Sequence, residues 1–249
     1  MLSSGGWAAL GVGFIFLMTS LGAASVLFCR EDTLPKSQTG MMGFAGGVMT
    51  AATVWSMLLP AIEQTRSEGT LPCWLPAAAG TAAGAAFLCA LDALILCLRR
   101  GGSAEKSSML MTAITLHNIP EGMAVGLAFA LSGGADGLTA AAALALGIGV
   151  QNVPEGAAVS LPLRRMGMSR GRAFSMGVLS GAVEPLFGML AVMAVSGISR
   201  IMPWLLGFSA GAMLYVVVCE LIPAADDRRG LFWYIAGFLL MMILDVALG

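Results

Sequence analysis

Charged residues are scarce in this 249-residue chain, and their scarcity excludes several classes of protein. Asp, Glu, Lys and Arg together make up 11% of the residues, against roughly 25% in soluble domains. The formal net charge is −1 and no basic stripe occurs, so nucleic acid is not expected as a partner. No Walker A motif is present, which excludes ATP hydrolysis by that route. None of the five cysteines forms a CxxC pair, so neither a zinc framework nor a disulfide framework is expected.

Apolar residues take the place of the missing charges. They make up 58% of the chain, with a mean hydropathy of +0.87, which is more apolar surface than a soluble protein of this size can bury. Eight apolar segments long enough to cross a membrane lie near residues 6–29, 40–62, 75–98, 108–131, 137–162, 172–197, 202–223 and 231–248. The sequence therefore predicts an all-α polytopic membrane protein in which residues 1–249 form a single transmembrane domain. The chain opens without the basic start of a signal peptide, so we expect the first helix to remain.

The positions of Lys and Arg predict how the chain is oriented. Of the 13 basic residues, eleven lie in the loops after the odd-numbered segments, and only Arg66 and Arg200 lie in the loops between them. Cytoplasmic loops carry an excess of Lys and Arg. The split therefore predicts an even number of helices with the N- and C-termini outside. The short loops favour a bacterial inner membrane as the location.

Internal similarities predict inverted repeats. Three pairs of segments share short motifs: HNIPEGMAVGL at 117–127 with QNVPEGAAVSL at 151–161, GFAGGVM at 43–49 with GFSAGAM at 207–213, and GAAFLCALD at 84–92 with GFLLMMILD at 237–245. The members of each pair run in opposite directions in the predicted topology. Helices 1–3 and 6–8 would thus form inverted three-helix repeats around helices 4 and 5, an arrangement typical of transporters with a binding site near the middle of the membrane.

Acidic residues interrupt the apolar segments without basic partners. They are Asp92, Glu121, Glu155, Glu184, Glu220 and Asp245, and no Lys or Arg lies at the centre of a segment. A charged side chain at this depth costs about 2.5–3.5 kcal/mol on insertion scales, so the compensating charge must come from protons or bound cations. We interpret Glu220, Asp92, Asp245 and Glu63 either as residues of an ion pathway or as interfacial carboxylates.

Two helical faces combine carboxylates, amides and one imidazole. The first face consists of His117, Asn118 and Glu121, and the second consists of Gln151, Asn152 and Glu155. Residues three and four apart lie on one side of a helix. If the two faces meet, their nitrogen and oxygen atoms suit Zn²⁺, Mn²⁺, Fe²⁺, Co²⁺ or Cd²⁺ better than Cu⁺, which prefers sulfur.

Prolines mark the same two places. Pro120 and Pro154 each precede a glutamate of the two faces, and each frees a backbone carbonyl four residues earlier and kinks its helix. Unpaired backbone at membrane depth is tolerated only where it lines a cavity or meets an ion. Glu184 is a further carboxylate that we expect to bridge or complete the site.

The HNIPEG and NVPEG motifs in a chain of eight apolar segments resemble the ZIP (Zrt/Irt-like) family of divalent metal transporters, and Gln151 in a compact chain resembles its GufA-like branch. The resemblance implies two metal positions at the membrane midplane. The first would use His117, Glu121, Gln151 and Glu155, and the second would use Asn118, Glu121, Asn152, Glu155 and Glu184. Met49 matches a position that can add a thioether. Many members have histidine in place of Gln151, so the first position here would have a single imidazole.

These observations lead to the hypothesis of a secondary transporter. It would move Zn²⁺, and also Cd²⁺, Fe²⁺, Mn²⁺ and Co²⁺, into the cytoplasm by alternating access. The resemblance implies that helices 1, 4, 5 and 6 move against helices 2, 3, 7 and 8. A channel-like facilitator and a membrane metalloenzyme stay open as alternatives, although we do not expect an enzyme. No prosthetic group is expected, the partners are the transported ion and the lipid bilayer, and a homodimer stays open.

Overall fold

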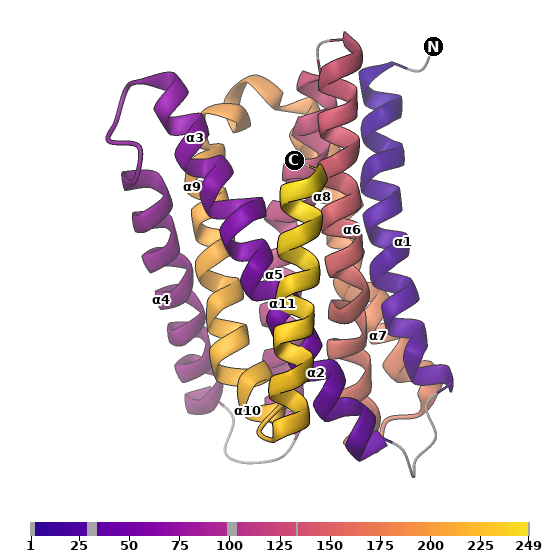
Figure 1. The fold of residues 1–249 in the computed structure, drawn as a ribbon. Coiled ribbons are helices and arrows are strands. Elements are labelled where there is room, and N and C mark those ends of the chain that lie inside the picture. Colours follow the sequence, from indigo (N-terminus) through magenta and orange to yellow (C-terminus); the bar gives the residue numbers. More distant parts are fainter. Residues whose placement is uncertain (1–2, 29–33, 99–103, 133, 249) are drawn as a thin grey trace.

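The computed structural model describes residues 3–28, 34–98, 104–132 and 134–248, and the regular elements in these ranges are all helical (Figure 1). In chain order they are α1 (Ser4–Phe28), α2 (Leu34–Ala52), η1 (Thr53–Leu58), α3 (Leu59–Glu68), α4 (Leu75–Leu98), α5 (Ala104–Leu131), α6 (Gly134–Arg165), α7 (Arg170–Gly181), α8 (Val183–Met193), α9 (Val195–Val216), η2 (Val217–Leu221), α10 (Ile222–Ala224) and α11 (Arg228–Leu248). The segments η1 and η2 are π-helices. The prediction of an all-α protein is confirmed for the described ranges.

Seven helical stretches in the described residues are long and apolar enough to cross a membrane. The predicted segment near 108–131 joins them only as the shorter apolar stretch Asn118–Leu131 of α5, because most side chains before it lie outside the described residues. The count of eight crossings therefore stays a prediction. The two chain ends lie toward the same end of the bundle (Figure 1), as an even number of crossings requires.

Glycines bring helices α1, α5, α6, α7 and α8 into backbone contact with one another. A Cβ added at Gly156 of α6 would overlap the carbonyl oxygen of Thr19 in α1, and one added at Gly122 of α5 would overlap the carbonyl oxygen of Glu184 in α8. Small residues allow such close approach between membrane helices. These five helices are called the first group below.

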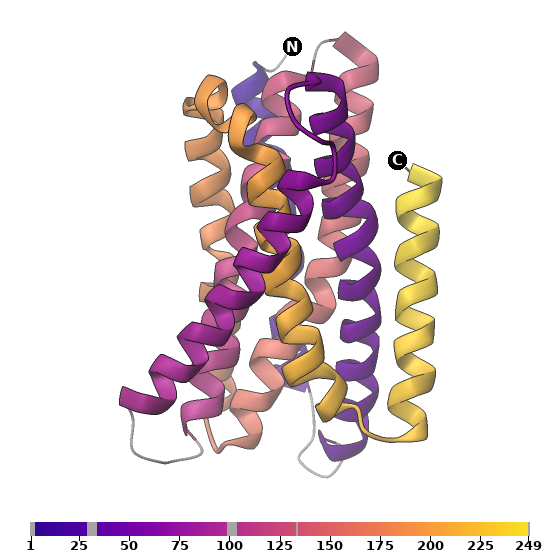
Figure 2. The same cartoon turned by 90° about the vertical axis from the view of Figure 1, so that its left-hand side faces the viewer.

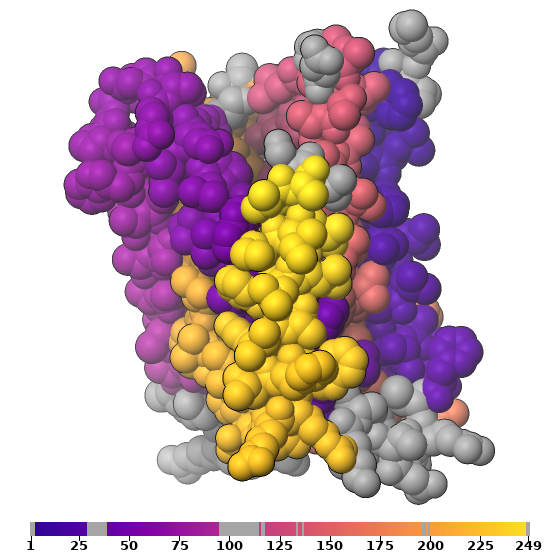
Figure 3. All heavy atoms as spheres, in the orientation of Figure 1, coloured from indigo at the N-terminus to yellow at the C-terminus, as the bar shows by residue number. Residues whose placement is uncertain are grey.

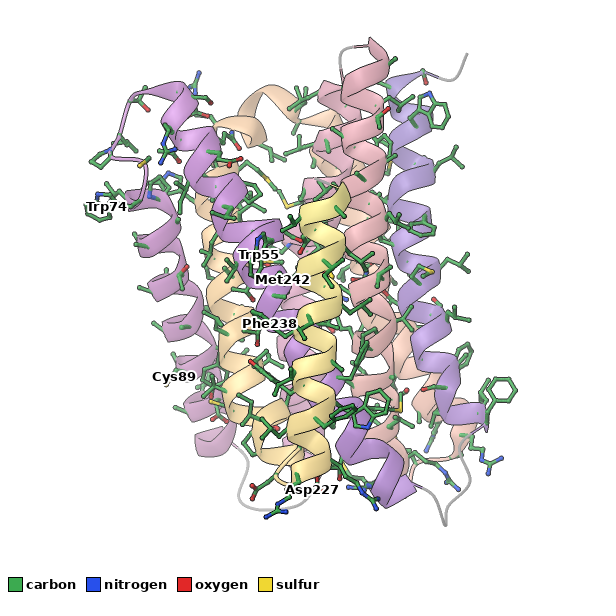
Figure 4. The ribbon with its side chains drawn as sticks, in the orientation of Figure 1. Trp55, Trp74, Cys89, Asp227, Phe238 and Met242 are labelled. Carbon is green, nitrogen blue, oxygen red and sulfur yellow. The ribbon has the colours of Figure 1, made fainter. Side chains whose placement is uncertain are left out.

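The remaining helices form a second group by the same means. A Cβ added at Gly47 of α2 would overlap the carbonyl oxygen of Tyr234 in α11, and one added at Gly84 of α4 would overlap the carbonyl oxygen of Phe208 in α9. Figure 2 shows α2 alongside α11 and α4 crossing α9. The ring of Trp55 in η1 also meets Phe238 of α11 edge to face, with 5.9 Å between ring centroids, and Met242 lies beside them (Figure 4).

The interface between the two groups has a different character. Every described glycine whose added Cβ would lie within 3.0 Å of another helix makes that contact inside its own group. Across the interface, side chains meet instead, and the largest buried cluster joins Met49 and Met213 of the second group to Ala157 and Ala158 of α6. Methionine is flexible and adapts to changing neighbours. The interface between the groups therefore interlocks less tightly than the backbone contacts inside either group.

The sixth predicted segment, 172–197, is two helices rather than one. Its residues form α7 and α8, separated at Ala182, together with the first turn of α9. Pro185 explains the break, because it has no N–H for the carbonyl of Gly181 and its ring crowds that carbonyl. The break places Glu184 in the first turn of α8.

The second and seventh predicted segments are longer than expected, because π-helices carry them through prolines. In η1 the N–H of Leu59, directly before Pro60, bonds to the carbonyl of Val54 five residues earlier. In η2 the N–H of Ile222, directly before Pro223, makes the equivalent bond. The helices therefore continue to Glu68 and Ala224, beyond the predicted ends at 62 and 223. The third segment runs from Leu75 to Leu98 as predicted. The inverted-repeat topology stays a prediction.

Candidate metal centre

Six of the eight predicted ligand side chains are buried in the first group. They are Asn118, Glu121, Gln151, Asn152, Glu155 and Glu184, and none has more than 1% of its surface exposed. They come from three helices, α5, α6 and α8. His117 belongs to α5, but its side chain lies outside the described residues. Such a concentration of buried polar groups is costly unless the groups bind one another or an ion.

The two motif helices meet through their polar faces. The amide Nε2 of Gln151 in α6 donates a hydrogen bond of 2.5 Å to Oε1 of Glu121 in α5. Both side chains are fully buried. The two helices therefore face each other at the predicted positions, and a carboxylate and an amide are within bonding distance of each other.

Glu184 connects α8 to two other helices. Its Oε1 accepts a hydrogen bond of 2.8 Å from the Thr19 hydroxyl of α1 and one of 3.2 Å from Nδ2 of Asn118 in α5. Glu121 and Glu155 are charged groups whose interaction with Glu184 is repulsive. A buried site that contains several carboxylates favours a bound cation, because the cation offsets their repulsion.

The local backbone explains why Glu184 reaches this site. The break at Ala182 begins a new helix, and Glu184 lies in its first turn, where the positive end of the helix dipole favours a carboxylate. Gly122 of α5 lets the two backbones touch at this point. Asn118 also donates a 3.2 Å hydrogen bond to the carbonyl of Ser180, at the end of α7.

Several oxygens of the site have no hydrogen-bond partner among the described residues. They are Oδ1 of Asn118, Oε1 of Gln151, Oδ1 of Asn152 and Oε2 of Glu184. A buried acceptor left unpaired costs about 1–3 kcal/mol, so each such oxygen calls for an explanation. Amide and carboxylate oxygens are ligands for divalent cations.

Amide oxygens are an essential part of this donor set. Within the described residues, no three His, Cys, Asp or Glu side chains gather closely enough to hold a metal by themselves. A cation here would draw on the amides of Asn118, Gln151 and Asn152 as well as the carboxylates. Each amide presents an N–H donor to a carboxylate or carbonyl in this arrangement, and rotation about its last bond would present the oxygen instead.

Met49 is fully buried in the cluster between the two groups. The Thr53 hydroxyl donates a 2.7 Å hydrogen bond to the carbonyl of Met49, and it also lies 3.1 Å from the sulfur of Met213. The same buried cluster contains Ala157 and Ala158 of α6. The role of Met49 as a ligand stays a prediction.

The four predicted pathway residues lie outside the six-residue cluster. Asp245 of α11 accepts a 2.9 Å hydrogen bond from Ser56, and it lines, together with Glu63, a 360 Å³ cavity between α3, α6 and α11. Asp92 of α4 accepts a 3.0 Å hydrogen bond from the Tyr215 hydroxyl of α9. Glu220 lies in η2.

Sequence reasoning missed Thr19. It lies on the buried stripe of α1, which also contains Ile15, Gly22 and Ala23, and this spacing of three and four residues is the signal that could have found it. A threonine in an apolar helix usually bonds to the carbonyl four residues earlier. Thr19 does so with Ile15 at 3.2 Å, and it binds Glu184 as well.

The fold and the site together define a class: a polytopic helical membrane protein with buried carboxylates and amides on facing helices. A sequence model described as ZIP zinc transporter matches residues 99–245. Zinc transporter GufA of Myxococcus xanthus is 38% identical, over 93% of this chain and 94% of that protein. Zinc transporter ZIP11 of Homo sapiens is 34% identical, over 97% of each chain. Zinc transporter ZIPB of Bordetella bronchiseptica is 37% identical, over 98% of this chain and 82% of that protein.

The chain therefore belongs to the ZIP zinc transporter family, and its resemblance to the GufA-like branch is confirmed. The family and these relatives are transporters rather than enzymes, so the metalloenzyme alternative is set aside.

Proposed function

We propose that this protein carries Zn²⁺ across the membrane into the cytoplasm, and that Cd²⁺, Fe²⁺, Mn²⁺ and Co²⁺ compete for the same site. The observation that carries the proposal is the convergence of six buried polar side chains from α5, α6 and α8, four of whose oxygens have no hydrogen-bond partner among the described residues. Membership of a family of zinc transporters supports the choice of ion.

The site would bind the ion through a change of hydrogen-bond partners. In the first position, Glu121 and Glu155 supply charge, His117 a nitrogen and Gln151 an amide oxygen. In the second, Asn118, Asn152 and Glu184 join the same two glutamates. A bound dication would offset the repulsion that Glu121 and Glu155 exert on Glu184. It would also take the place of the amide N–H groups that now donate to Glu121 and Glu184. One imidazole among many oxygens suits a borderline ion such as Zn²⁺ without excluding the harder Mn²⁺.

Alternating access follows from the contrast between the two groups. Inside each group, glycines place backbone against backbone, so each group resists deformation. Between them, methionine and alanine side chains form the largest buried cluster, and such an interface can slide with little loss of contact. The first group contains all six polar residues of the site, so it would carry the ion while the second group stays fixed.

The proposed orientation in the membrane rests on charge. α7 and α11 begin at one end of the bundle with Arg170, Arg172, Arg228 and Arg229 (Figure 1), and an excess of basic residues favours the cytoplasmic side of a bacterial inner membrane for that end. Both termini would then lie outside, and the cavity lined by Glu63 and Asp245 would be the outer entrance for cations.

The proposal is tested by ion flux into proteoliposomes. We expect saturable Zn²⁺ flux for the wild type, competition by the other ions, and loss of at least about 90% of the flux in Glu121→Ala, because removing one buried ligand typically costs on the order of tenfold or more in affinity or activity. Glu68→Ala is the matched control, since Glu68 is exposed at the end of α3. Wild-type flux equal to that of empty vesicles, or full flux in Glu121→Ala, would contradict the proposal.

A further inference from the structure

An apolar cavity lies on the outer seam between the two groups, away from the predicted ion pathway. It measures 480 Å³ and is bounded by α1, α2, α6 and α11, with Leu21, Phe44, Pro154 and Trp233 among its walls. Its volume is in the range of roughly 300–1,000 Å³ that is usual for ligand sites. In Figure 3, α6 is seen between α11 and α1.

The cavity opens toward the membrane rather than toward water. Leu21 and Trp233 at its rim have 59% and 46% of their surface exposed, and both belong to helices that are apolar enough to span the bilayer. At that depth the surrounding solvent is hydrocarbon. Ser25 is among the lining residues, and its hydroxyl is buried and has no hydrogen-bond partner among the described residues.

Basic side chains lie at one end of this cavity. Arg229 precedes Trp233 by four residues and so shares its face of α11. Arg170 donates a 3.4 Å hydrogen bond to the carbonyl of Leu27, just beyond Ser25 on α1. The nearby Asp227 (Figure 4) is engaged as a cap, accepting a 2.6 Å hydrogen bond from the N–H of Gly230. Six described arginines lie at the adjoining ends of α6, α7 and α11, against the acidic residues Asp226, Asp227 and, in η2, Glu220.

We propose that this cavity binds one acyl chain of an anionic phospholipid, taken from the leaflet at the arginine-rich end. The chain lies between the two groups against Pro154, and the phosphate lies near Arg229 and Arg170. An apolar furrow in contact with hydrocarbon is filled by an acyl chain rather than by water, and the arginines at its end select the negative headgroup. The proposal requires only that the chain spans a membrane, and it does not depend on which ion is transported.

Such a lipid would act on the arrangement of the two groups. The wall formed by Val153 and Pro154 directly adjoins Asn152 and Glu155 of the metal centre. A ligand that fills the seam in one arrangement shifts the population toward that arrangement. Under the alternating access proposed above, on which this one step rests, the bound acyl chain regulates ion movement.

Tryptophan fluorescence provides the test. Trp7, Trp55, Trp74 and Trp204 are replaced by Phe, which leaves Trp233 as the only reporter, and a second protein retains only Trp74. Trp74 lies at the opposite end of the bundle from Asp227 (Figure 4) and is 60% exposed. Each protein is placed in phosphatidylcholine bilayers with increasing amounts of phosphatidylglycerol whose acyl chains are brominated, because bromine quenches a tryptophan that it touches.

We expect half-maximal quenching of Trp233 at a lipid fraction about tenfold lower than for Trp74, since each arginine near the surface favours an anionic lipid. Ser25→Phe, which fills the cavity, should remove this difference, whereas Leu17→Phe on the exposed side of α1 should preserve it. Two results would overturn the proposal. One is that Trp233 and Trp74 show the same quenching at each fraction of brominated phosphatidylglycerol, and the other is that brominated phosphatidylcholine quenches Trp233 as strongly as brominated phosphatidylglycerol does. If the single-tryptophan chain does not fold, the total tryptophan quenching of the wild-type chain is compared with that of its Ser25→Phe variant, and equal quenching of the two would overturn the proposal.

Discussion

At the residue scale, the hydrogen bond from Thr19 to Glu184 fixes a carboxylate that has few other supports. Thr19→Val keeps the shape of the side chain but removes the 2.8 Å bond to Oε1. Groups that orient a metal ligand are typically worth 10–100-fold in affinity, so we expect the zinc concentration for half-maximal flux to rise about tenfold while the maximal flux changes less. Thr19→Ser should restore the wild-type value. A Ser variant that behaves like the Val variant would indicate a packing role instead.

Gln151 offers a second test at this scale, because it determines how many imidazoles the site contains. Its Nε2 bonds to Glu121 at 2.5 Å, so a histidine at position 151 would bring a ring nitrogen to the same carboxylate. Imidazole suits Zn²⁺, whereas Mn²⁺ prefers oxygen ligands. We therefore expect Gln151→His to increase the preference for Zn²⁺ over Mn²⁺ by about tenfold, measured as competition in flux. An unchanged preference would remove Gln151 from the first metal position.

Most of the site residues that the sequence predicted belong to a motif repeated on a second helix, and Glu184 is the exception, predicted as a carboxylate within an apolar segment. Asn118 and Glu121 match Asn152 and Glu155, so a helical period sufficed to place them on facing surfaces. Thr19 has no such counterpart, and its partner Glu184 is 165 positions away in sequence. Only the packing of α1 against α8 brings the two together. The His117 side chain and the ligand role of Met49 stay predictions.

At the element scale, Gly122 allows α5 to lie against α8 at the height of the proposed metal centre. A Cβ at this position would overlap the backbone of Glu184, and a backbone cannot move aside as the end of a side chain can. Gly122→Ala should therefore separate the helices, lower the melting temperature by several degrees, as a loss of about 1–3 kcal/mol from overpacking implies, and reduce zinc flux. Gly13→Ala on α1 is the control, since nothing lies within 4 Å of its added Cβ. Equal melting temperatures for the two variants would contradict this account.

Hydropathy located the helices but not the details of their hydrogen bonding. The third segment was predicted to the residue, at Leu75–Leu98, because apolar residues fill it and no proline interrupts it. The break at Ala182 and the π-helices η1 and η2 depend on how the backbone accommodates Pro185, Pro60 and Pro223. A proline shows where a carbonyl loses its partner, but neighbouring helices decide whether the helix breaks or widens.

For the whole molecule, the central question is whether the two groups move relative to each other. A carrier and a channel-like facilitator can use the same ligands, so the proposed metal centre does not distinguish them. A covalent link between the groups does, because it blocks alternating access and leaves a fixed pore open. Gly147 of α6 and Met241 of α11 are suitable positions, since a Cβ added at Gly147 lies 3.8 Å from Cε of Met241.

We expect a cleavable thiol cross-linker, long enough to span the length of the replaced methionine side chain as well, to stop zinc flux in Gly147→Cys/Met241→Cys, in a chain without its native cysteines, and we expect flux to return when the linker is cleaved. Gly46→Cys/Leu221→Cys is the control inside the second group, where the added Cβ lies 3.5 Å from Cβ of Leu221, at the short end of the disulfide range. Its link should leave flux unchanged. Gly147 lines the neighbouring cavity, so a reagent attached there could block ion flux without linking the groups. Gly147→Cys alone, treated with the same reagent, shows how much flux is lost through this obstruction. Undiminished flux in the linked protein would mean that ions pass without movement of the groups, as in a channel.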